Sequence, residues 1–112
     1  MENDSINLNL LRQKMDKIDD ELVRLFEHRM EVTEEIARYK LVHNLPVYDP
    51  AREQQKIQEL SQKVKKGRES NISVLYSLLF KLSRADQEQI INKERSKKEQ
   101  VLLINNTLKE NV

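Results

Sequence analysis

Residues 7–42 read NLNLLRQKMDKIDDELVRLFEHRMEVTEEIARYKLV, and this stretch decides the fold. Apolar residues recur in it by alternating steps of four and three, which places them on one face of an α-helix. A helix of about 35 residues, with a rise of about 1.5 Å per residue, is roughly 50 Å long, longer than a compact domain of this size is wide. The members of this apolar stripe are Leu11, Met15, Ile18, Leu22, Leu25, Val32 and Ile36.

The length of this helix indicates how the protein assembles. One chain of 112 residues is too small to cover both halves of such a rod, so we expect a second copy to cover the rest. The sequence therefore predicts an intertwined helical homodimer. A plain coiled coil is the simpler alternative, but it does not account for the charged residues on the stripe or for a short second helix.

Two cations interrupt the apolar stripe. Arg29 and Lys40 occupy positions where the repeat predicts an apolar residue, and their spacing of about three turns makes them point the same way. An unpaired charge on a buried face is costly, so each cation needs an anionic partner. A structural salt bridge from Arg29 or Lys40 to Glu53 is one possibility, and an anionic ligand is the other.

Proline, glycine and capping residues divide the rest of the chain into two further helices. Leu45-Pro46-Val47 ends the first helix, and Asp49-Pro50 begins the second with an N-cap followed by a proline in the first turn. We expect the second helix to end at Lys66-Gly67 and the third to begin near Ser70-Asn71. No segment reads as a strand, so the fold class is all-α with three helices and a very long first helix.

The last part of the chain differs from the rest in composition. Residues 93–98 are a charged run, and residues 101–104 are apolar. We therefore divide the chain into a helical domain, 1–91, and a C-terminal extension, 92–112. The extension either continues the third helix or caps the dimer.

The composition limits the classes of function. Lys and Arg (20) nearly balance Asp and Glu (19), which gives no electrostatic reason to expect nucleic acid or an anionic membrane as a partner. The absence of Cys and the presence of only two His argue against a metal site. The chain shows neither a secretory signal nor an apolar run long enough to cross a membrane, so we expect a cytoplasmic protein.

Polar side chains also interrupt the apolar faces of the other two helices. Glu53 lies in line with the apolar residues of the second helix, and Ser83 and Gln87 lie four residues apart on the inner face of the third. Arg12 lies roughly 100° around the first helix from Arg29, so it faces the same pocket of its own chain less directly. Taken alone it reads as an exposed surface arginine, whereas in an intertwined dimer it could reach the pocket of the partner. Cations, one carboxylate and neutral donors together suit a small polyanion that carries a hydroxyl. No nucleophile with a paired base is present, so any chemistry would rest on orientation and electrostatic stabilisation.

Several of these segments together resemble the all-helical chorismate mutases. The resemblance covers about residues 8–91, and its pieces are specific as an ordered set. They are Leu11-Arg12 with Ile18-Asp19, then Arg29, Lys40, the run LPVYDPARE at 45–53 and the run LFKLSRADQ at 79–87.

The resemblance implies an enzyme that converts chorismate to prephenate, at the branch of the shikimate pathway towards phenylalanine and tyrosine, in an intertwined dimer without cofactor or metal. It implies that Arg29, with Arg12 of the other protomer, binds the two carboxylates of chorismate. Lys40 and Gln87 would donate to the ether oxygen, and Glu53 with the Asp49 backbone would bind the ring hydroxyl. Arg52 and Ser83 would complete the anion-binding wall.

Two other functions are compatible with the same residues. An isochorismate–pyruvate lyase on this scaffold would use the same cations and eliminate pyruvate, although Glu53 beside the Asp49 turn favours the mutase. A weakly active regulatory or docking module is the alternative from another class, since the apolar extension leaves room for a partner.

Overall fold

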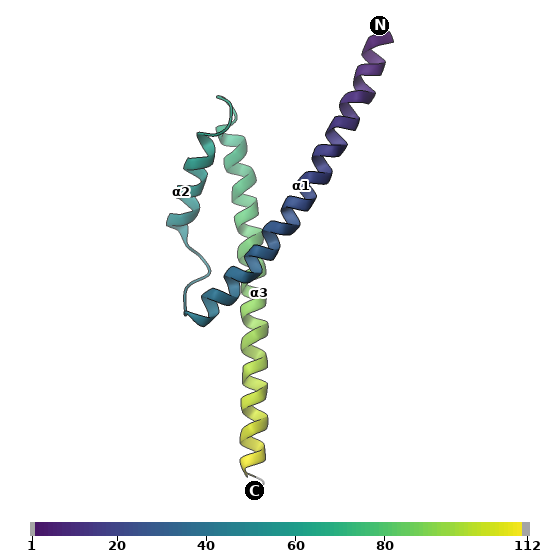
Figure 1. Ribbon diagram of the computed structural model, residues 1–112. Helices are drawn as coiled ribbons and strands as arrows, with labels where there is room; N and C mark the ends of the chain where they lie inside the picture. Colours follow the sequence, from purple (N-terminus) through teal and green to yellow (C-terminus); the bar gives the residue numbers. More distant parts are fainter. Residues whose placement is uncertain (1, 111–112) are drawn as a thin grey trace. The chain divides into compact units, whose positions relative to one another are not determined.

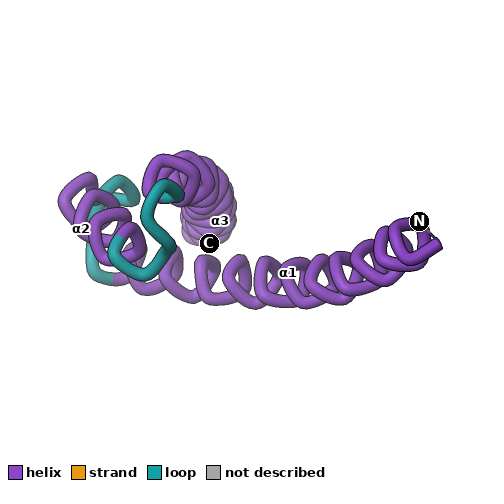
Figure 2. Tube along the Cα trace, turned by 90° about the horizontal axis from the view of Figure 1, so that it is seen from above, coloured by secondary structure: helices purple, strands orange, loops and turns teal. Residues whose placement is uncertain are grey.

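Three α-helices make up the described part of the protein, a computed structural model that covers the backbone of residues 2–110 and the side chains of residues 7–110. Helix α1 spans Glu2–Val42, α2 spans Pro50–Ser61 and α3 spans Glu69–Glu110. Figure 2 shows only helices and loops over these residues. The predicted fold class, all-α with a very long first helix, is confirmed; α1 begins at Glu2, earlier than the expected Asn7.

The chain forms two compact units, Met1–Val32 and Thr33–Val112. The first unit is the N-terminal part of α1, and the second contains the end of α1 together with α2 and α3. In the first unit, the side chains of Leu11, Met15, Ile18, Leu22 and Leu25 each expose between 50% and 58% of their surface. The described chain therefore leaves the apolar stripe of this unit largely uncovered.

The end of α1 is fixed by a left-handed residue. Asn44 has φ 54°, and the N–H of the next residue, Leu45, donates to the carbonyl of Lys40 at 2.9 Å. The N–H of Asn44 itself donates to Leu41 at 3.4 Å. These two bonds form a Schellman motif, which satisfies carbonyls that the last turn leaves open. The helix ends before Pro46 as predicted, but Asn44 makes the turn.

The start of α2 has the predicted cap, whereas its end does not lie where expected. The Asp49 carboxylate accepts a hydrogen bond of 3.1 Å from the backbone N–H of Arg52, and Pro50 occupies the first turn. The helix ends at Ser61, so the predicted end at Lys66-Gly67 is wrong. Gly67 has φ 97°, and its N–H donates to the Glu69 carboxylate at 2.9 Å. This glycine therefore belongs to the turn that enters α3.

Helix α2 packs beside the first part of α3 within the second unit (Figure 1). The predicted inner residues Ile57 and Leu60 of α2 are partly buried, as are Ile72 and Tyr76 of α3; Val64, predicted to share their face, lies beyond the end of α2 and is also partly buried. The fully buried positions lie where the end of α1 meets α3. They are Thr33, Ala37, Ser83, Gln87 and Ile91.

This core uses a different face of α1 from the apolar stripe. Thr33 and Ala37 are buried, while the stripe residues Val32 and Ile36 expose 40% and 42% of their surface. The two residues whose hydroxyls join α1 to α3, Thr33 and Ser83, both have small side chains, so this contact does not use the large residues of the stripe. The stripe therefore stays open on the second unit as well as on the first.

The C-terminal extension continues α3 up to Glu110. Of the two alternatives for residues 92–112, the structure shows the one in which the extension continues the third helix. The side chains of residues 95–110 are exposed, including the apolar group Val101, Leu102, Leu103 and Ile104.

Candidate functional site

A small buried layer of polar side chains joins α1 to α3. The Thr33 hydroxyl donates to the Ser83 hydroxyl oxygen at 3.4 Å, beside the fully buried Ala37. Ser83 and Gln87 each expose only 7%, which confirms that both lie on the inner face of α3. The Oε1 atom of Gln87 is buried and has no hydrogen-bond partner among the described residues. A buried amide oxygen without a partner is uncommon in proteins.

Lys40 lies one turn beyond Ala37 on α1, and its side chain is partly buried. Its ammonium donates a hydrogen bond of 2.8 Å to the backbone carbonyl of Val47. Within residues 7–110, no carboxylate forms an ion pair with it. No carboxylate of the described residues thus competes with an anionic ligand for Lys40.

Glu53 is neutralised by a residue that sequence reasoning did not single out. Its two carboxylate oxygens each lie 2.5 Å from a terminal guanidinium nitrogen of Arg84, on α3. The alternative in which Lys40 pairs with Glu53 is therefore wrong. Both side chains are partly buried, exposing 21% for Glu53 and 30% for Arg84.

The surroundings of Arg84 favour its charged form. The hydrogen bond to Glu53 raises the pKa of Arg84 above its ordinary value, with partial burial acting in the opposite direction. Its guanidinium carbon also lies 4.8 Å from the ring centroid of Tyr48, within the range of a cation–π interaction. Arg84 thus contacts both the loop before α2 and the first turn of that helix.

Within the second unit, contacts join Lys40 to the loop before α2, that loop to Arg84, and Arg84 to Glu53. Asp49 and Arg52 form the cap of the same turn, and both are exposed. Ser83 and Gln87 lie on α3 next to and one turn after Arg84. Arg12, which is exposed, and Arg29, which is partly buried, belong to the first unit.

Three residues of this region were not predicted as functional: Thr33, Tyr48 and Arg84. Thr33 follows the stripe residue Val32, so it occupies the neighbouring face of α1. Tyr48 and Arg84 lie inside the segments that carry the resemblance, and Arg84 directly follows Ser83. The sequence shows where Tyr48 and Arg84 lie along the chain, but the contacts that these two side chains make depend on how α2 packs against α3.

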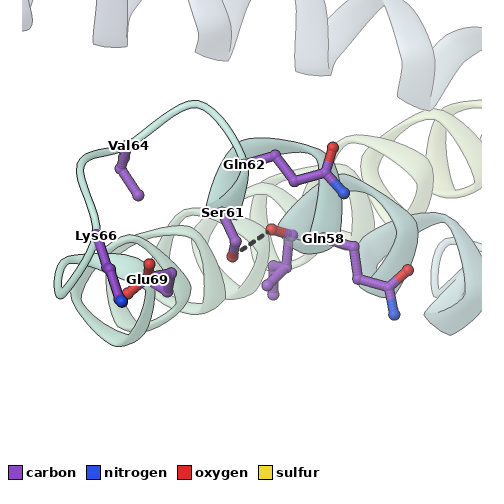
Figure 3. Close-up of a pocket in the computed structure, with 7 residues that line it drawn as sticks. Gln58, Ser61, Gln62, Val64, Lys66 and Glu69 are labelled. Atoms are coloured by element: carbon purple, nitrogen blue, oxygen red, sulfur yellow. Dashed lines mark hydrogen bonds between the residues drawn. The ribbon is translucent and has the colours of Figure 1, made fainter.

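A separate cavity of about 670 Å³ opens at the other end of α2 (Figure 3). Its lining includes Ser61, whose hydroxyl donates to the carbonyl of Ile57 at 2.7 Å. None of the eight predicted site residues lines it. The remaining lining residues are Ile57, Gln58, Gln62, Val64, Lys66 and Glu69.

The described residues contain no cluster of three or more His, Cys, Asp or Glu side chains arranged to bind a metal ion. None of the helices over residues 2–110 combines the length and the apolar content that a bilayer crossing requires.

Comparison with known proteins identifies the family. The model of the family chorismate mutase type II matches residues 11–88. The chain belongs to this family. All eight predicted site residues lie within the matched range, as do Thr33, Tyr48 and Arg84, while the C-terminal extension lies beyond it.

The chorismate mutase type II match is accompanied by a similarity to one part of a much longer protein. The chain is 42% identical over 43 residues to the protein named T-protein of Haemophilus influenzae (strain ATCC 51907 / DSM 11121 / KW20 / Rd). The aligned stretch makes up 38% of this chain and 11% of that relative. No solved structure matches the chain.

Proposed function

We propose that this protein is a cytoplasmic chorismate mutase, which rearranges chorismate to prephenate for the synthesis of phenylalanine and tyrosine. Membership of the chorismate mutase type II family supports this assignment. The observation that carries it is the state of Lys40 in the second unit: a partly buried ammonium that has no carboxylate partner among the described residues. A cation in this condition is suited to a ligand that brings negative charge.

For this reaction the protein has to bind the substrate and stabilise developing charge, and no further chemistry is required. Chorismate rearranges within a single molecule, so the site must hold a compact chair-like conformer and stabilise the charge that develops as the ether C–O bond breaks. Lys40 and the amide of Gln87 donate to this ether oxygen. No covalent intermediate, metal or cofactor takes part.

The other polar side chains bind the ends of the substrate. Arg29 binds one carboxylate, and Arg52 with Ser83 completes the anion-binding wall. Glu53 and the backbone of Asp49 bind the ring hydroxyl. The Asp49 carboxylate caps α2, which is consistent with a backbone role for this residue towards the substrate.

The second carboxylate is bound by Arg12 of a partner protomer in an intertwined homodimer. The exposed stripe on the first unit supports this assembly, since five apolar side chains that are each half exposed would be costly to leave in water.

Residues 1–91 form the chorismate mutase domain in this proposal, and residues 92–112 form an extension to it.

A direct assay tests the proposal. Purified protein is supplied separately with chorismate and with isochorismate, and prephenate and salicylate are measured. We expect prephenate from chorismate, without formation of salicylate. Salicylate and pyruvate from isochorismate would instead identify a lyase on this scaffold. Absence of turnover with either substrate would contradict an enzymatic role and favour a regulatory or docking module.

A further inference from the structure

The ion pair between Glu53 and Arg84 presents a problem for a purely structural interpretation. Both side chains lie on helix surfaces that are only partly covered, and such pairs contribute little to stability. Yet this one is held closely: one guanidinium nitrogen donates to both carboxylate oxygens, and the Tyr48 ring lies against the guanidinium. A constrained geometry at a position that gains little stability calls for another explanation.

The charge of Glu53 supplies that explanation. In the proposed function, Glu53 accepts a hydrogen bond from the ring hydroxyl of a substrate that carries two carboxylates. An isolated carboxylate would repel such a dianion. Arg84 cancels this charge before the substrate arrives.

The geometry of the pair leaves the Glu53 carboxylate able to accept a hydrogen bond from the substrate hydroxyl. A carboxylate offers about four lone-pair sites, and the contacts with Arg84 use one on each oxygen. The remaining sites can accept from a hydroxyl. The guanidinium also limits rotation of the carboxylate, because rotation would break one of the two contacts.

We propose that Arg84 is a positioning residue of the substrate site: it neutralises and orients Glu53, so that this carboxylate binds the hydroxyl of a dianionic substrate without repelling the carboxylates of that substrate. Tyr48 supports Arg84 from the loop before α2. This inference rests on the proposed function, and it adds to that function a residue that does not itself touch the substrate.

The test combines single and double variants in a steady-state assay with chorismate. Arg84→Met removes the charge but keeps much of the side-chain length, and Glu53→Gln removes the charge that Arg84 balances. We expect Arg84→Met to raise KM about 10- to 100-fold, the range for losing a hydrogen bond to a charged group. In the Glu53→Gln background, where no carboxylate remains to be neutralised, the same substitution should change KM by less than about twofold.

A further variant separates charge from orientation. Arg84→Lys keeps the charge but loses the planar guanidinium that lies against the Tyr48 ring and holds the donor in place, so we expect a KM near that of the wild type and a lower kcat. This variant also keeps the test decisive if Arg84→Met fails to fold. Arg95→Met, an exposed arginine further along α3, is the matched control and should leave both constants unchanged.

Three results would overturn the inference. The first is wild-type kinetics in Arg84→Met. The second is an equal rise in KM with and without Glu53→Gln, which would mean that Arg84 does not act through Glu53. The third is a high KM in Arg84→Lys. If Arg84→Met folds, this means a KM equal to that of Arg84→Met; if Arg84→Met does not fold, it means a KM about 10-fold or more above that of the wild type. An active wild-type protein with any of these results would leave the proposed function standing, whereas an inactive one would overturn both.

Discussion

The ammonium of Lys40 donates a hydrogen bond of 2.8 Å to the carbonyl oxygen of Val47, seven residues further along the chain. This bond ties the end of α1 to the loop that leads to Tyr48 and Asp49. It satisfies one of three ammonium donors and leaves the charge without a counter-ion among residues 7–110. The same side chain therefore supports the loop and keeps donors for a ligand.

Removing this ammonium should abolish most of the catalysis. We expect Lys40→Ala to lower kcat about 10²- to 10³-fold, the usual loss when one donor to a developing oxyanion is removed. Circular dichroism should show an unchanged helix content, since one side-chain bond to a loop contributes little to the fold. Lys81→Ala, on the exposed face of α3, is the matched control. A kcat within a few-fold of the wild type would exclude Lys40 from the reacting end of the substrate.

Much of the fold was predictable because its signals are local. The Asp49-Pro50 cap and the proline after α1 act over a few residues, and each places a boundary that the structure confirms. The apolar repeat predicts the long helix α1 but not its start at Glu2. The end of α2 was mispredicted because Gly67 gives the same local signal whether it ends one helix or precedes the next. Ser61 ends α2 before the glycine is reached.

The site was predictable in part for the same reason. Ser83 and Gln87 follow from helical spacing alone, and both are buried. The pairing of Glu53 with Arg84 depends on the relative rotation of two helices, which no repeat within either helix specifies. The burial of Thr33 in place of Val32 likewise depends on which face of α1 contacts α3, where Thr33 bonds to Ser83.

The amide of Gln87 offers a test of the third helix. Gln87→Glu keeps the shape of the side chain, but only a protonated carboxyl can donate to the ether oxygen. We therefore expect the variant to be active at acid pH and to lose activity as the pH rises, while the wild type varies little. Rates measured at saturating chorismate over a series of buffers provide the comparison. A flat profile in an active variant would show that this side chain does not donate in the reaction.

The turn at Asn44 permits a prediction about stability that does not depend on function. Asn44 adopts a left-handed conformation, which costs most residues roughly 1–2 kcal/mol and costs glycine almost nothing. Asn44→Ala should therefore lower the free energy of unfolding by about 1 kcal/mol, and Asn44→Gly should leave it equal or slightly higher. Urea unfolding followed by circular dichroism measures both. Equal losses in the two variants would mean that the side chain of Asn44 matters more than its backbone conformation.

The small stabilisation that the ion pair of Arg84 contributes should persist well into the alkaline range. The hydrogen bond to Glu53 raises the pKa of Arg84, so the folded state binds this proton more tightly than the unfolded state. The stability gained is complete below the unfolded pKa and is lost only as the pH rises through the higher folded pKa. The difference in unfolding free energy between wild type and Arg84→Met should therefore remain constant from about pH 7 to about pH 10. A difference that shrinks over this interval would show that another group controls the pair.

A mixing experiment tests whether Arg12 acts across the dimer. Arg12→Ala and Arg29→Ala should each be nearly inactive alone, because each removes a cation that binds a substrate carboxylate. In a heterodimer of the two, one site combines an intact Arg29 with an intact Arg12 from the other protomer, and the second site lacks both. Random exchange of equal amounts makes half of the dimers mixed, so about a quarter of the wild-type activity should return. Subunit exchange is verified by mass spectrometry of an isotope-labelled partner. If exchange is complete and no activity returns, Arg12 does not complete the partner's site.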